Sequence, residues 1–551
     1  MAAENKSYSY HIFLFPFKWE LKQEGKKLKQ AVFSDLANLE IADKLVLQDE
    51  RWTTDLYNSF NSHEDYNEFI FFYPFVRDVL YDYHADLDRN TLIRHYEFKL
   101  PTSEKVQYII NIKKDNKKYY LDVEYILLNL YKTGVGLLSY HLKNDKPHQL
   151  EWNDILNINE YGRRLYPQFL THEFSCDVTK KSFLADSIEI SNLDVTLAES
   201  FFIADDFEDN TGISKNIKHT SPEEIDIIPN HIDKILPQHF LEIIQHKLKP
   251  VIDDRMFVVS AFFDGNKKYN DRIKELKKND KGILQSTFNK ELYEYIFVDG
   301  PDSSGVGNDD FRDKLVTEHT YGRWVGKATF FGISRYSFVS YSDFFPVPVH
   351  TRTMYYKMAE LCLVQRASVL NFTEEVSRIS KLEEGPKALT QKLNDLYKNY
   401  IQFVNKIYFR EVTAQEQGIE LYDMLQKHMR LREEVKDLDN ELGELHNYVS
   451  LLEEKERNRQ LSILTTLGAL FILPSFILTF IGSSDKIPEA MKRIPLLLFL
   501  AVVAISPLFI FSAGKSKKAI NNKRRLRKWL LIILVAALFF FLLFYPKTSS
   551  E

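Results

Sequence analysis

The sequence predicts an α+β (or α/β) cytoplasmic domain, then an antiparallel helical section with a long coiled-coil stalk helix, and finally C-terminal transmembrane helices. Three observations lead to this fold class. Short aromatic runs rich in β-forming residues recur up to residue 345, apolar residues follow a heptad spacing between 421 and 452, and long uncharged apolar runs fill the chain after 460. With 44% apolar residues among 551, the chain can bury a large core.

The charge of the chain is unevenly distributed. Residues 1–460 carry 60 Lys and Arg against 74 Asp and Glu, whereas residues 461–551 carry 12 against 3. Nonspecific nucleic-acid binding needs clustered cations, so we expect no direct nucleic-acid partner for the acidic part. Cys176 and Cys362 form no metal-ligand pattern and suit a reducing compartment, and the N-terminus lacks the pattern of a signal peptide.

Residues 1–345 are predicted to form a cytoplasmic sensor domain. Strands are expected at 8–17, 68–75, 106–112, 119–130, 256–263, 293–298 and 328–339. Helices and loops separate these runs, which is typical of a mixed fold. The acidic stretch 204–233 is interpreted as a solvated loop, with a divalent-cation site as the alternative.

The segment 321–338 interleaves cations, aromatic residues and glycines. Arg323, Lys327 and Arg335 are candidates to hold an anionic ligand, and Trp324 or Tyr336 to stack on a base. The alternative is an aromatic-packed strand pair with exposed cations. Phosphate loops, dinucleotide fingerprints, nucleophile elbows and metalloprotease motifs are absent from the sequence, so no catalytic or metal-binding residue is assigned and we expect no enzyme.

Residues 346–411 are predicted to be a helical section with a break at 383–387, and residues 412–460 a stalk helix. The apolar seam of the stalk consists of Leu421, Met424, His428, Leu431, Val435, Leu438, Leu442, Leu445, Val449 and Leu452. Its partner is either the same helix of other subunits or the preceding helices of the same chain. His428 is interpreted as setting the register, and Gly443 as a weak point of the helix. No Pro or Gly follows Leu452 before the apolar runs, so one helix is expected to continue into the membrane.

Three apolar runs are long enough to span a membrane: 461–482, 494–512 and 529–545. The loop 515–528 carries eight positive charges and no negative one, which places it in the cytoplasm together with the N-terminal domain. We therefore expect a multi-pass protein in contact with membrane lipid. In the alternative, only two runs span, and the last segment lies on the membrane or re-enters it.

One face of the first span carries small and hydroxyl-bearing residues. The candidates to line a pore are Asn458, Leu461, Thr465, Gly468, Ile472, Ser475, Thr479 and Gly482. Close packing between helices, for which small residues are common in membranes, is the alternative. No ionisable residue lies inside a span, so a proton relay is not expected.

The entry into the first span, Asn458-Arg-Gln-Leu461-Ser-Ile-Leu464-Thr465, and the basic Arg527-Lys-Trp-Leu530 resemble the CorA superfamily of divalent-cation transporters. That family carries a Gly-Met-Asn signature after its first span, where this chain has Gly482-Ser-Ser-Asp485. This difference and the third span depart from the family pattern. A constitutive magnesium or divalent-cation transporter is the alternative function, with Mg²⁺ as a candidate ion; the architecture favours it and the changed signature counts against it.

The enlarged aromatic N-terminal domain, with the segment 321–338 and the helix around Arg366-Ala-Ser, is similar to the CorA-like membrane effectors associated with type III CRISPR systems. This resemblance implies a homopentameric ion channel in the bacterial inner membrane that functions in antiviral defence. It also implies gating by a small anionic nucleotide second messenger, S-adenosylmethionine conjugated to AMP (SAM-AMP). No other cofactor is expected to be required.

Overall fold

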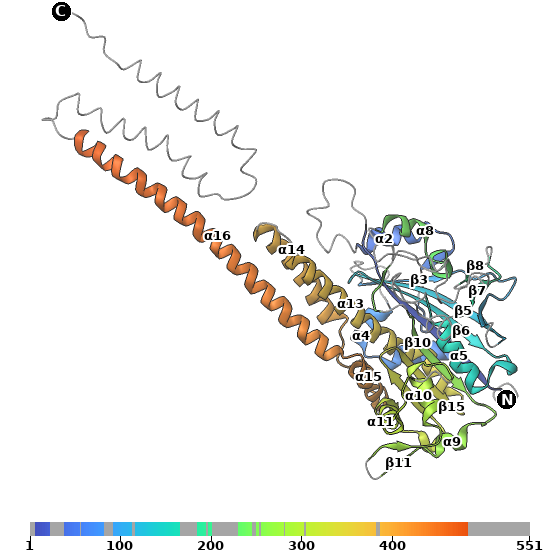
Figure 1. Cartoon of the computed structure of the whole chain (residues 1–551). Helices are drawn as coiled ribbons and strands as arrows, with labels where there is room; N and C mark the ends of the chain where they lie inside the picture. Colours follow the sequence, from blue (N-terminus) through green and yellow to red (C-terminus); the bar gives the residue numbers. More distant parts are fainter. Residues whose placement is uncertain are drawn as a thin grey trace, which may run out of the picture. The chain divides into compact units, whose positions relative to one another are not determined.

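The computed structural model describes residues 6–21, 38–54, 57–81, 92–112, 116–165, 185–193, 197–200, 230–244, 249–252, 255–279, 282–301, 305–381 and 386–482 (Figure 1). The chain divides into two compact units. One comprises residues 1–384 and 391–445, and the other comprises residues 385–390 and 446–551. The first unit contains the sheet described below and most of the helices that follow it.

A mixed sheet of 13 strands forms the centre of the first unit among the residues that the structure describes. Its main order is β13 (Thr320–Tyr321), β14 (Phe330–Ser334), β15 (Ser337–Ser342), β10 (Phe257–Phe263), β1 (Tyr8–Lys18), β6 (Val135–Asn144), β5 (Lys117–Tyr131), β4 (Gln107–Ile112), β7 (Ser187–Ser191) and β8 (Leu197–Ser200). β2 (Trp52–Thr54) pairs with β3 (Ile93–Phe98), β3 with β5, and β9 (Lys249–Pro250) with β1. β10 and β15 are parallel, and β1 is antiparallel to both β10 and β6.

Successive side chains of β1 point to opposite faces of this sheet. His11 points toward α5 (Trp152–Gly162), where its Nδ1 lies 2.7 Å from Asn159 Oδ1. Tyr10 points to the other face, where the Arg352 guanidinium lies 5.8 Å from its ring centre. Arg352 belongs to the π-helical turn Thr351–Tyr355, which leads into α13 (Tyr356–Ser380). Helices therefore cover both faces of the sheet.

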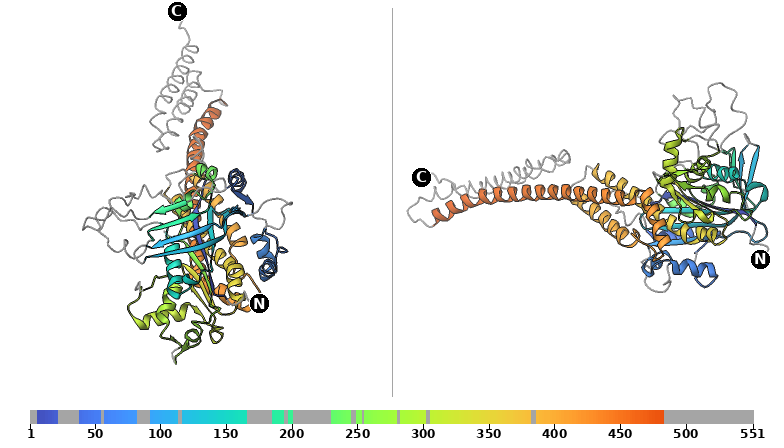
Figure 2. Two further views of the ribbon diagram at one scale, coloured as in Figure 1. Left: turned by 90° about the vertical axis from the view of Figure 1, so that its right-hand side faces the viewer. Right: turned by 90° about the horizontal axis from the view of Figure 1, so that it is seen from below.

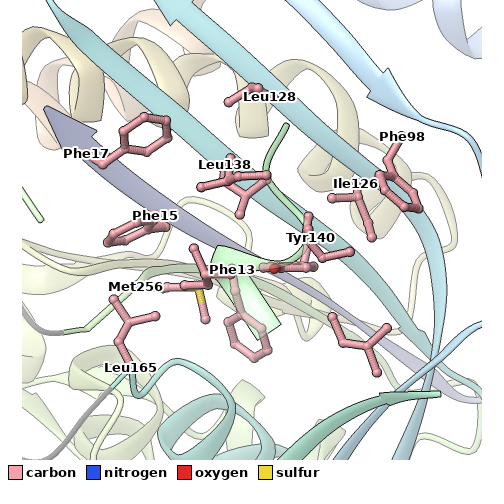
Figure 3. Packing of buried hydrophobic residues seen from close by; sticks show 14 of the residues in the cluster. Phe13, Phe15, Phe17, Phe98, Ile126, Leu128, Leu138, Tyr140, Leu165 and Met256 are labelled. Atoms are coloured by element: carbon pink, nitrogen blue, oxygen red, sulfur yellow. The ribbon is translucent and has the colours of Figure 1, made fainter. Parts of the chain in front are cut away.

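A large apolar core lies on the α5 face and is shown in Figure 3. Phe13, Phe15 and Phe17 of β1 pack beside Leu138 and Tyr140 of β6, and all five are buried. Aromatic residues bury large apolar areas, so this cluster supplies much of the driving force for folding.

Gly162, at the end of α5, allows the helix to approach this core closely. The Tyr108 hydroxyl donates to the Gly162 carbonyl oxygen at 3.0 Å. A Cβ atom at Gly162 would lie 2.5 Å from Cζ of Phe13, closer than packed carbon atoms can come.

Two predicted strands are wrong. Residues 68–75 fall in α3 (His63–Phe71) and α4 (Pro74–Leu80), and residues 293–298 fall mostly in α10 (Asn289–Phe297). α3 begins with an N-cap, since Ser62 Oγ accepts the Asp65 N–H at 3.0 Å. α10 ends at Phe297, because the next residue, Val298, adopts a left-handed conformation with φ 55°. The other expected strands are present, and 328–339 forms the β14–β15 hairpin.

Short helices connect the strands. They are α2 (Leu39–Val46), α7 (Asn230–Asp233), α8 (Gln238–Ile243), α9 (Asn270–Lys274) and α11 (Asp309–His319), with 3₁₀ turns at Pro147–Gln149 and Val325–Lys327 and a small hairpin of β11 (Lys277–Lys278) and β12 (Leu284–Gln285). The helical section comprises α12 (Pro346–His350), the π-helical turn, α13, α14 (Pro386–Lys406), α15 (Glu416–His428) and α16 (Leu431–Gly482). α13 ends at Ser380, before the predicted break at 383–387, and α14 begins within the predicted break at Pro386.

The stalk is interrupted, contrary to the prediction of one helix across the whole seam. α15 ends at His428, and Arg430 takes a left-handed conformation with φ 56° before α16 begins at Leu431. The Met429 N–H bonds to the Leu425 carbonyl and the Arg430 N–H to the Lys427 carbonyl, each at 3.0 Å, which closes the end of α15. The seam therefore belongs to two helices.

α16 is continuous from Leu431 to Gly482, as expected for a stalk that runs on into the first predicted span (Figure 2). Its seam residues Leu438 and Leu442 are at most 1% exposed in the single chain. The Tyr400 hydroxyl of α14 reaches the Val435 carbonyl at 3.4 Å, so α14 is one of the helices that pack on the start of α16. The partner of the apolar seam at the start of α16 is therefore the preceding helices of the same chain, and not the same helix of other subunits.

Several predicted features lie outside the described residues. They are the spans 494–512 and 529–545, the basic loop 515–528, Cys176, most of the acidic stretch 204–233 and the residues 483–485 that replace the family signature.

Candidate functional site

The predicted ligand segment 321–338 forms the edge of the sheet next to the stalk helices. It contains β13, a 3₁₀ turn, β14 and the first part of β15. The structure places its five candidate residues in two groups, one against α15 and one against the first turn of α16.

The first group surrounds Trp324. The Arg323 guanidinium and the Lys327 ammonium lie 5.8 and 5.2 Å from its ring centre, and its indole N–H donates to Gln417 Oε1 on α15 at 3.2 Å. Arg323 Nη1 also donates to Glu420 Oε2 on α15 at 2.8 Å. These contacts hold the edge of the sheet against α15. The Trp324 indole N–H and one N–H of the Arg323 guanidinium are therefore already hydrogen-bonded within the chain.

The second group lies in the tight turn between β14 and β15. Arg335 Nη2 pairs with Glu434 Oε1 at 3.0 Å, and Glu434 belongs to the first turn of α16. The Tyr336 ring has two guanidinium neighbours, Arg255 at 5.1 Å and Arg366 at 5.5 Å from its centre. Arg366 of α13 also donates from Nη1 to the Arg335 carbonyl oxygen at 3.2 Å.

Two further arginines extend this group into the core at the end of α5. Arg163 Nη2 donates to Glu160 Oε2 at 2.8 Å and to the Val298 carbonyl at 2.7 Å, and Arg164 Nη2 donates to Glu160 Oε1 at 2.5 Å. Arg164 forms a β-bridge with Arg255, which connects them to Tyr336. We call the set Arg163, Arg164, Arg255, Arg335 and Arg366 the arginine cluster.

Burial and charge perturb the ionisation of the groups in this cluster. Burial and the neighbouring Glu160 raise the pKa of Asp299 to about 6, although Arg163, Arg164 and Arg255 oppose the increase. Burial also lowers the pKa of the Arg366 guanidinium, and the adjacent Arg335 lowers it further.

Sequence reasoning found only Arg335 and Tyr336 of this group as site residues. Arg163, Arg164 and Arg255 are distant from them in the chain, and Arg366 was noted only within the resemblance. One signal was present in the sequence, because Arg163 and Arg164 directly follow the helix that contains Glu160. Three charged residues so close together at the end of a buried helix indicate a polar network in the core.

His428 stacks on His319 instead of lying in a continuous apolar seam. Their ring centres are 3.8 Å apart, with an interplanar angle of 27°. His319 Nδ1 donates to the Ile333 carbonyl at 2.5 Å, and burial lowers the pKa of His428 to about 4, with His319 as the next cause. Burial also lowers the pKa of His319, so both rings are neutral near pH 7. The stack joins α11 to the end of α15 beside the break at Arg430.

A groove of about 780 Å³ lies between α14, α15 and the start of α16. Its lining is mixed and includes Tyr397, Tyr400, Tyr408, Arg410 and Arg432. Acidic residues such as Glu411, Asp423 and Asp439 also line it, so this groove offers no net cationic surface to an anion.

The candidate pore-lining residues all fall on α16. Asn458, Leu461, Thr465, Gly468, Ile472, Ser475, Thr479 and Gly482 lie between its first residue and its last. Thr465 Oγ1 donates back to the Leu461 carbonyl at 2.8 Å, so its hydroxyl is bonded within the helix. Within the part of the chain that the structure describes, no helix combines the length and the apolar character needed to cross a membrane.

The described residues contain no group of three or more His, Cys, Asp or Glu side chains arranged to hold a metal ion. Cys362 is buried and unbonded to another cysteine.

One comparison with known families gives a match to the C-terminal helices. Residues 373–517 match the family described as CorA-like Mg²⁺ transporter protein. The match begins near the end of α13, includes α14, α15 and α16, and continues beyond the described residues. The match covers only this part of the chain, and it supports the CorA-like superfamily. No curated protein and no solved structure matches the chain.

Proposed function

We propose that the chain is a ligand-gated, homo-oligomeric ion channel of CorA type, in which the N-terminal domain is the sensor. One observation carries this proposal. The helix that runs continuously to Gly482 is held at its first turn by the Arg335–Glu434 ion pair to the edge of the sensor sheet. A change at that edge has a direct covalent route along α16 to the segment predicted to enter the membrane.

The proposed ligand is a small anionic nucleotide, with SAM-AMP as the specific candidate. The resemblance to type III CRISPR effectors suggests this ligand, a pentameric assembly, the bacterial inner membrane and a role in antiviral defence. The cations gathered at Tyr336 are compatible with an anionic ligand, because arginine pairs well with phosphate oxygens.

In this proposal, ligand binding shifts the equilibrium between two positions of the stalk. The Arg335–Glu434 ion pair is formed in the ligand-free protein and broken in the ligand-bound protein. Such a shift requires the ligand to bind more tightly to the state in which the ion pair is broken. The small-residue face of α16, which includes Thr465 and Gly468, is then proposed to line the opened pore.

The test is ion flux through the full-length protein in liposomes. Vesicles with Mg²⁺ and K⁺ gradients are measured before and after addition of SAM-AMP. We expect flux only when SAM-AMP is present. Flux of Mg²⁺ that is equal with and without SAM-AMP would contradict ligand gating.

The second candidate is a constitutive magnesium or divalent-cation transporter, which the family match at 373–517 favours. The replacement of the family signature by Gly482-Ser-Ser-Asp485 counts against it. Expression in cells that lack magnesium transport distinguishes the two functions. Restored growth without any added ligand would favour the constitutive transporter.

A further inference from the structure

The groove between α14, α15 and the start of α16 combines aromatic rings with charges of both signs. Its volume of about 780 Å³ is in the range of binding sites for small molecules, which often lie between packed helices. Its lining contains equal numbers of cationic and anionic side chains, namely Arg410, Arg432, Lys436, Glu411, Asp423 and Asp439. The groove therefore suits a ligand that itself carries both signs of charge.

Two cations of this lining are available to a ligand. Arg410 and Lys436 are exposed and form no hydrogen bond or ion pair with any residue that the structure describes. Arg432, by contrast, donates from Nη2 to Asp423 Oδ1 at 2.5 Å. Arg410 lies near the Tyr408 side chain, because burial raises the pKa of Tyr408 while Arg432 and Arg410 oppose the increase. Arg410 and Lys436 can thus hold an acidic group of a ligand inside the groove.

Aromatic and apolar side chains of α14 form one wall of the groove. Tyr397 and Ile401 lie one turn apart on the same face of the helix, and each is 41% exposed. The Tyr400 ring lies behind Tyr397, with the two ring centres 6.4 Å apart. Burial, and then the neighbouring Asp439, raises the pKa of Tyr400. An aromatic wall beside a carboxylate suits a planar ring and a positively charged group.

We propose that this groove binds a small molecule that combines an aromatic ring with a positive and a negative group. The inference rests on the proposed function, because it gives the place and the chemical class of the ligand that the sensor recognises. SAM-AMP belongs to this class, since it carries adenine rings, a sulfonium group and a phosphate group. The tyrosine rings hold the adenine and sulfonium groups, and Arg410 and Lys436 hold the phosphate group.

The groove and the ion pair that holds the stalk lie on opposite sides of α16. Arg432 and Lys436 line the groove and share one face of the helix. Glu434 lies two residues from each of them, which is about 200° of helical rotation, and it pairs with Arg335 at 3.0 Å. A ligand that draws the first turn of α16 into the groove therefore moves Glu434 away from Arg335.

The experiment is isothermal titration of SAM-AMP into the full-length protein in detergent. Adenosine is titrated in parallel and shows what an uncharged ring and ribose contribute. We expect SAM-AMP to bind at least about tenfold more tightly than adenosine, because charge-assisted hydrogen bonds to the phosphate group add to stacking. Equal affinity of the two compounds, or no binding of SAM-AMP, would overturn the proposed site.

Two variants, each with a matched control, localise the binding. Tyr397→Ala removes an exposed ring of the groove and Lys436→Gln an exposed charge, and each is expected to weaken SAM-AMP binding by at least about fivefold. Tyr448→Ala and Lys455→Gln make the same changes at exposed residues of α16 outside the lining, and should alter binding by less than about twofold. Unchanged affinity in either groove variant would overturn the assignment.

The link from the groove to the stalk has a readout of its own. Glu434→Gln removes the ion pair that opposes movement of α16 into the groove. We therefore expect this variant to bind SAM-AMP about two- to fivefold more tightly than the natural protein. An unchanged affinity would show that the groove and the ion pair do not oppose each other.

The binding experiment and the flux experiment fail independently. If SAM-AMP opens the channel but its binding is insensitive to the groove variants, the site is wrong and the gating proposal stands. If the groove variants weaken SAM-AMP binding but flux never responds to SAM-AMP, the site stands and the gating proposal is wrong.

Discussion

Burial determines the charge of several single residues in the sensor domain. His11, His141 and His231 are buried, and burial lowers their pKa values to about 4, 3 and 3. The unfolded chain would bind protons at these residues first as the pH falls below about 6.5. These three residues therefore destabilise the folded state as the pH falls from about 6.5 toward 4.

Glu68 gives a pH prediction of the opposite sign. Burial raises its pKa to about 7, and the Tyr81 hydroxyl donates to its Oε1 at 2.7 Å. An acid with a raised pKa stabilises the fold when protonated, and this contribution is lost as the pH rises through about 7. Glu68→Gln mimics the protonated form, so we expect its Tm to change less than that of the natural protein between pH 6 and pH 8.

Thermal unfolding of the full-length protein in detergent at the two pH values measures this difference. Glu104→Gln changes an exposed glutamate and serves as the control. If Glu68→Gln and Glu104→Gln show the same pH dependence, ionisation of Glu68 does not limit stability at high pH.

At the scale of secondary-structure elements, two glycines test the description of packing. Gly162→Ala would place Cβ 2.5 Å from Cζ of Phe13, and we expect a loss of about 1–3 kcal/mol of unfolding free energy. Gly443→Ala adds the same atom to the middle of α16, where nothing lies within 4 Å, and should stabilise by up to about 1 kcal/mol. Denaturant titration of both variants measures the difference, and a neutral Gly162→Ala would contradict the close approach of α5.

The face of α16 proposed to line the pore gives a second prediction at this scale. Gly468→Leu and Gly482→Leu should abolish ligand-dependent flux, because large side chains would fill a narrow opening, while size-exclusion chromatography should show unchanged assembly. Thr466→Leu is the matched control, since two residues turn the helix by about 200° and place residue 466 on another face. Unchanged flux in both glycine variants would remove the pore assignment.

The sequence predicted elements well where a long pattern repeats. The strands around Tyr8 and Lys117 and the continuous course of α16 followed from composition and period. The helices at 68–75 and 293–298 were missed, because short aromatic runs do not distinguish a strand from a buried helix. The break at Arg430 depends on one backbone conformation and leaves no pattern in the sequence.

The candidate site was less predictable than the elements. Arg335 and Tyr336 lie in a segment whose cations and aromatic residues attract attention, but their partners come from α5, from residue 255 and from α13. Contacts between residues so far apart in the chain depend on the order of strands in the sheet. The parallel pairing of β10 with β15, which brings residue 255 near Tyr336, could not be read from local patterns.

At the scale of the whole molecule, the central claim is that the sensor domain controls ion flow through α16. The contact that carries this claim is the Arg335–Glu434 ion pair, which is partly exposed and therefore contributes at most about 1 kcal/mol. An ion pair of this strength can shift the equilibrium between the closed and the open channel while both states stay populated. In an oligomer, the ion pair of each subunit would contribute to this shift.

The most direct measurement is ligand-free flux through liposomes containing Glu434→Gln. Without the carboxylate, Arg335 no longer holds the first turn of α16, so we predict that flux in the absence of SAM-AMP rises by about two- to fivefold for each subunit released. Glu433→Gln, at the exposed neighbouring residue, should remain closed without ligand. If Glu434→Gln is as tightly closed as Glu433→Gln and opens at the same SAM-AMP concentration, α16 is not controlled through this contact.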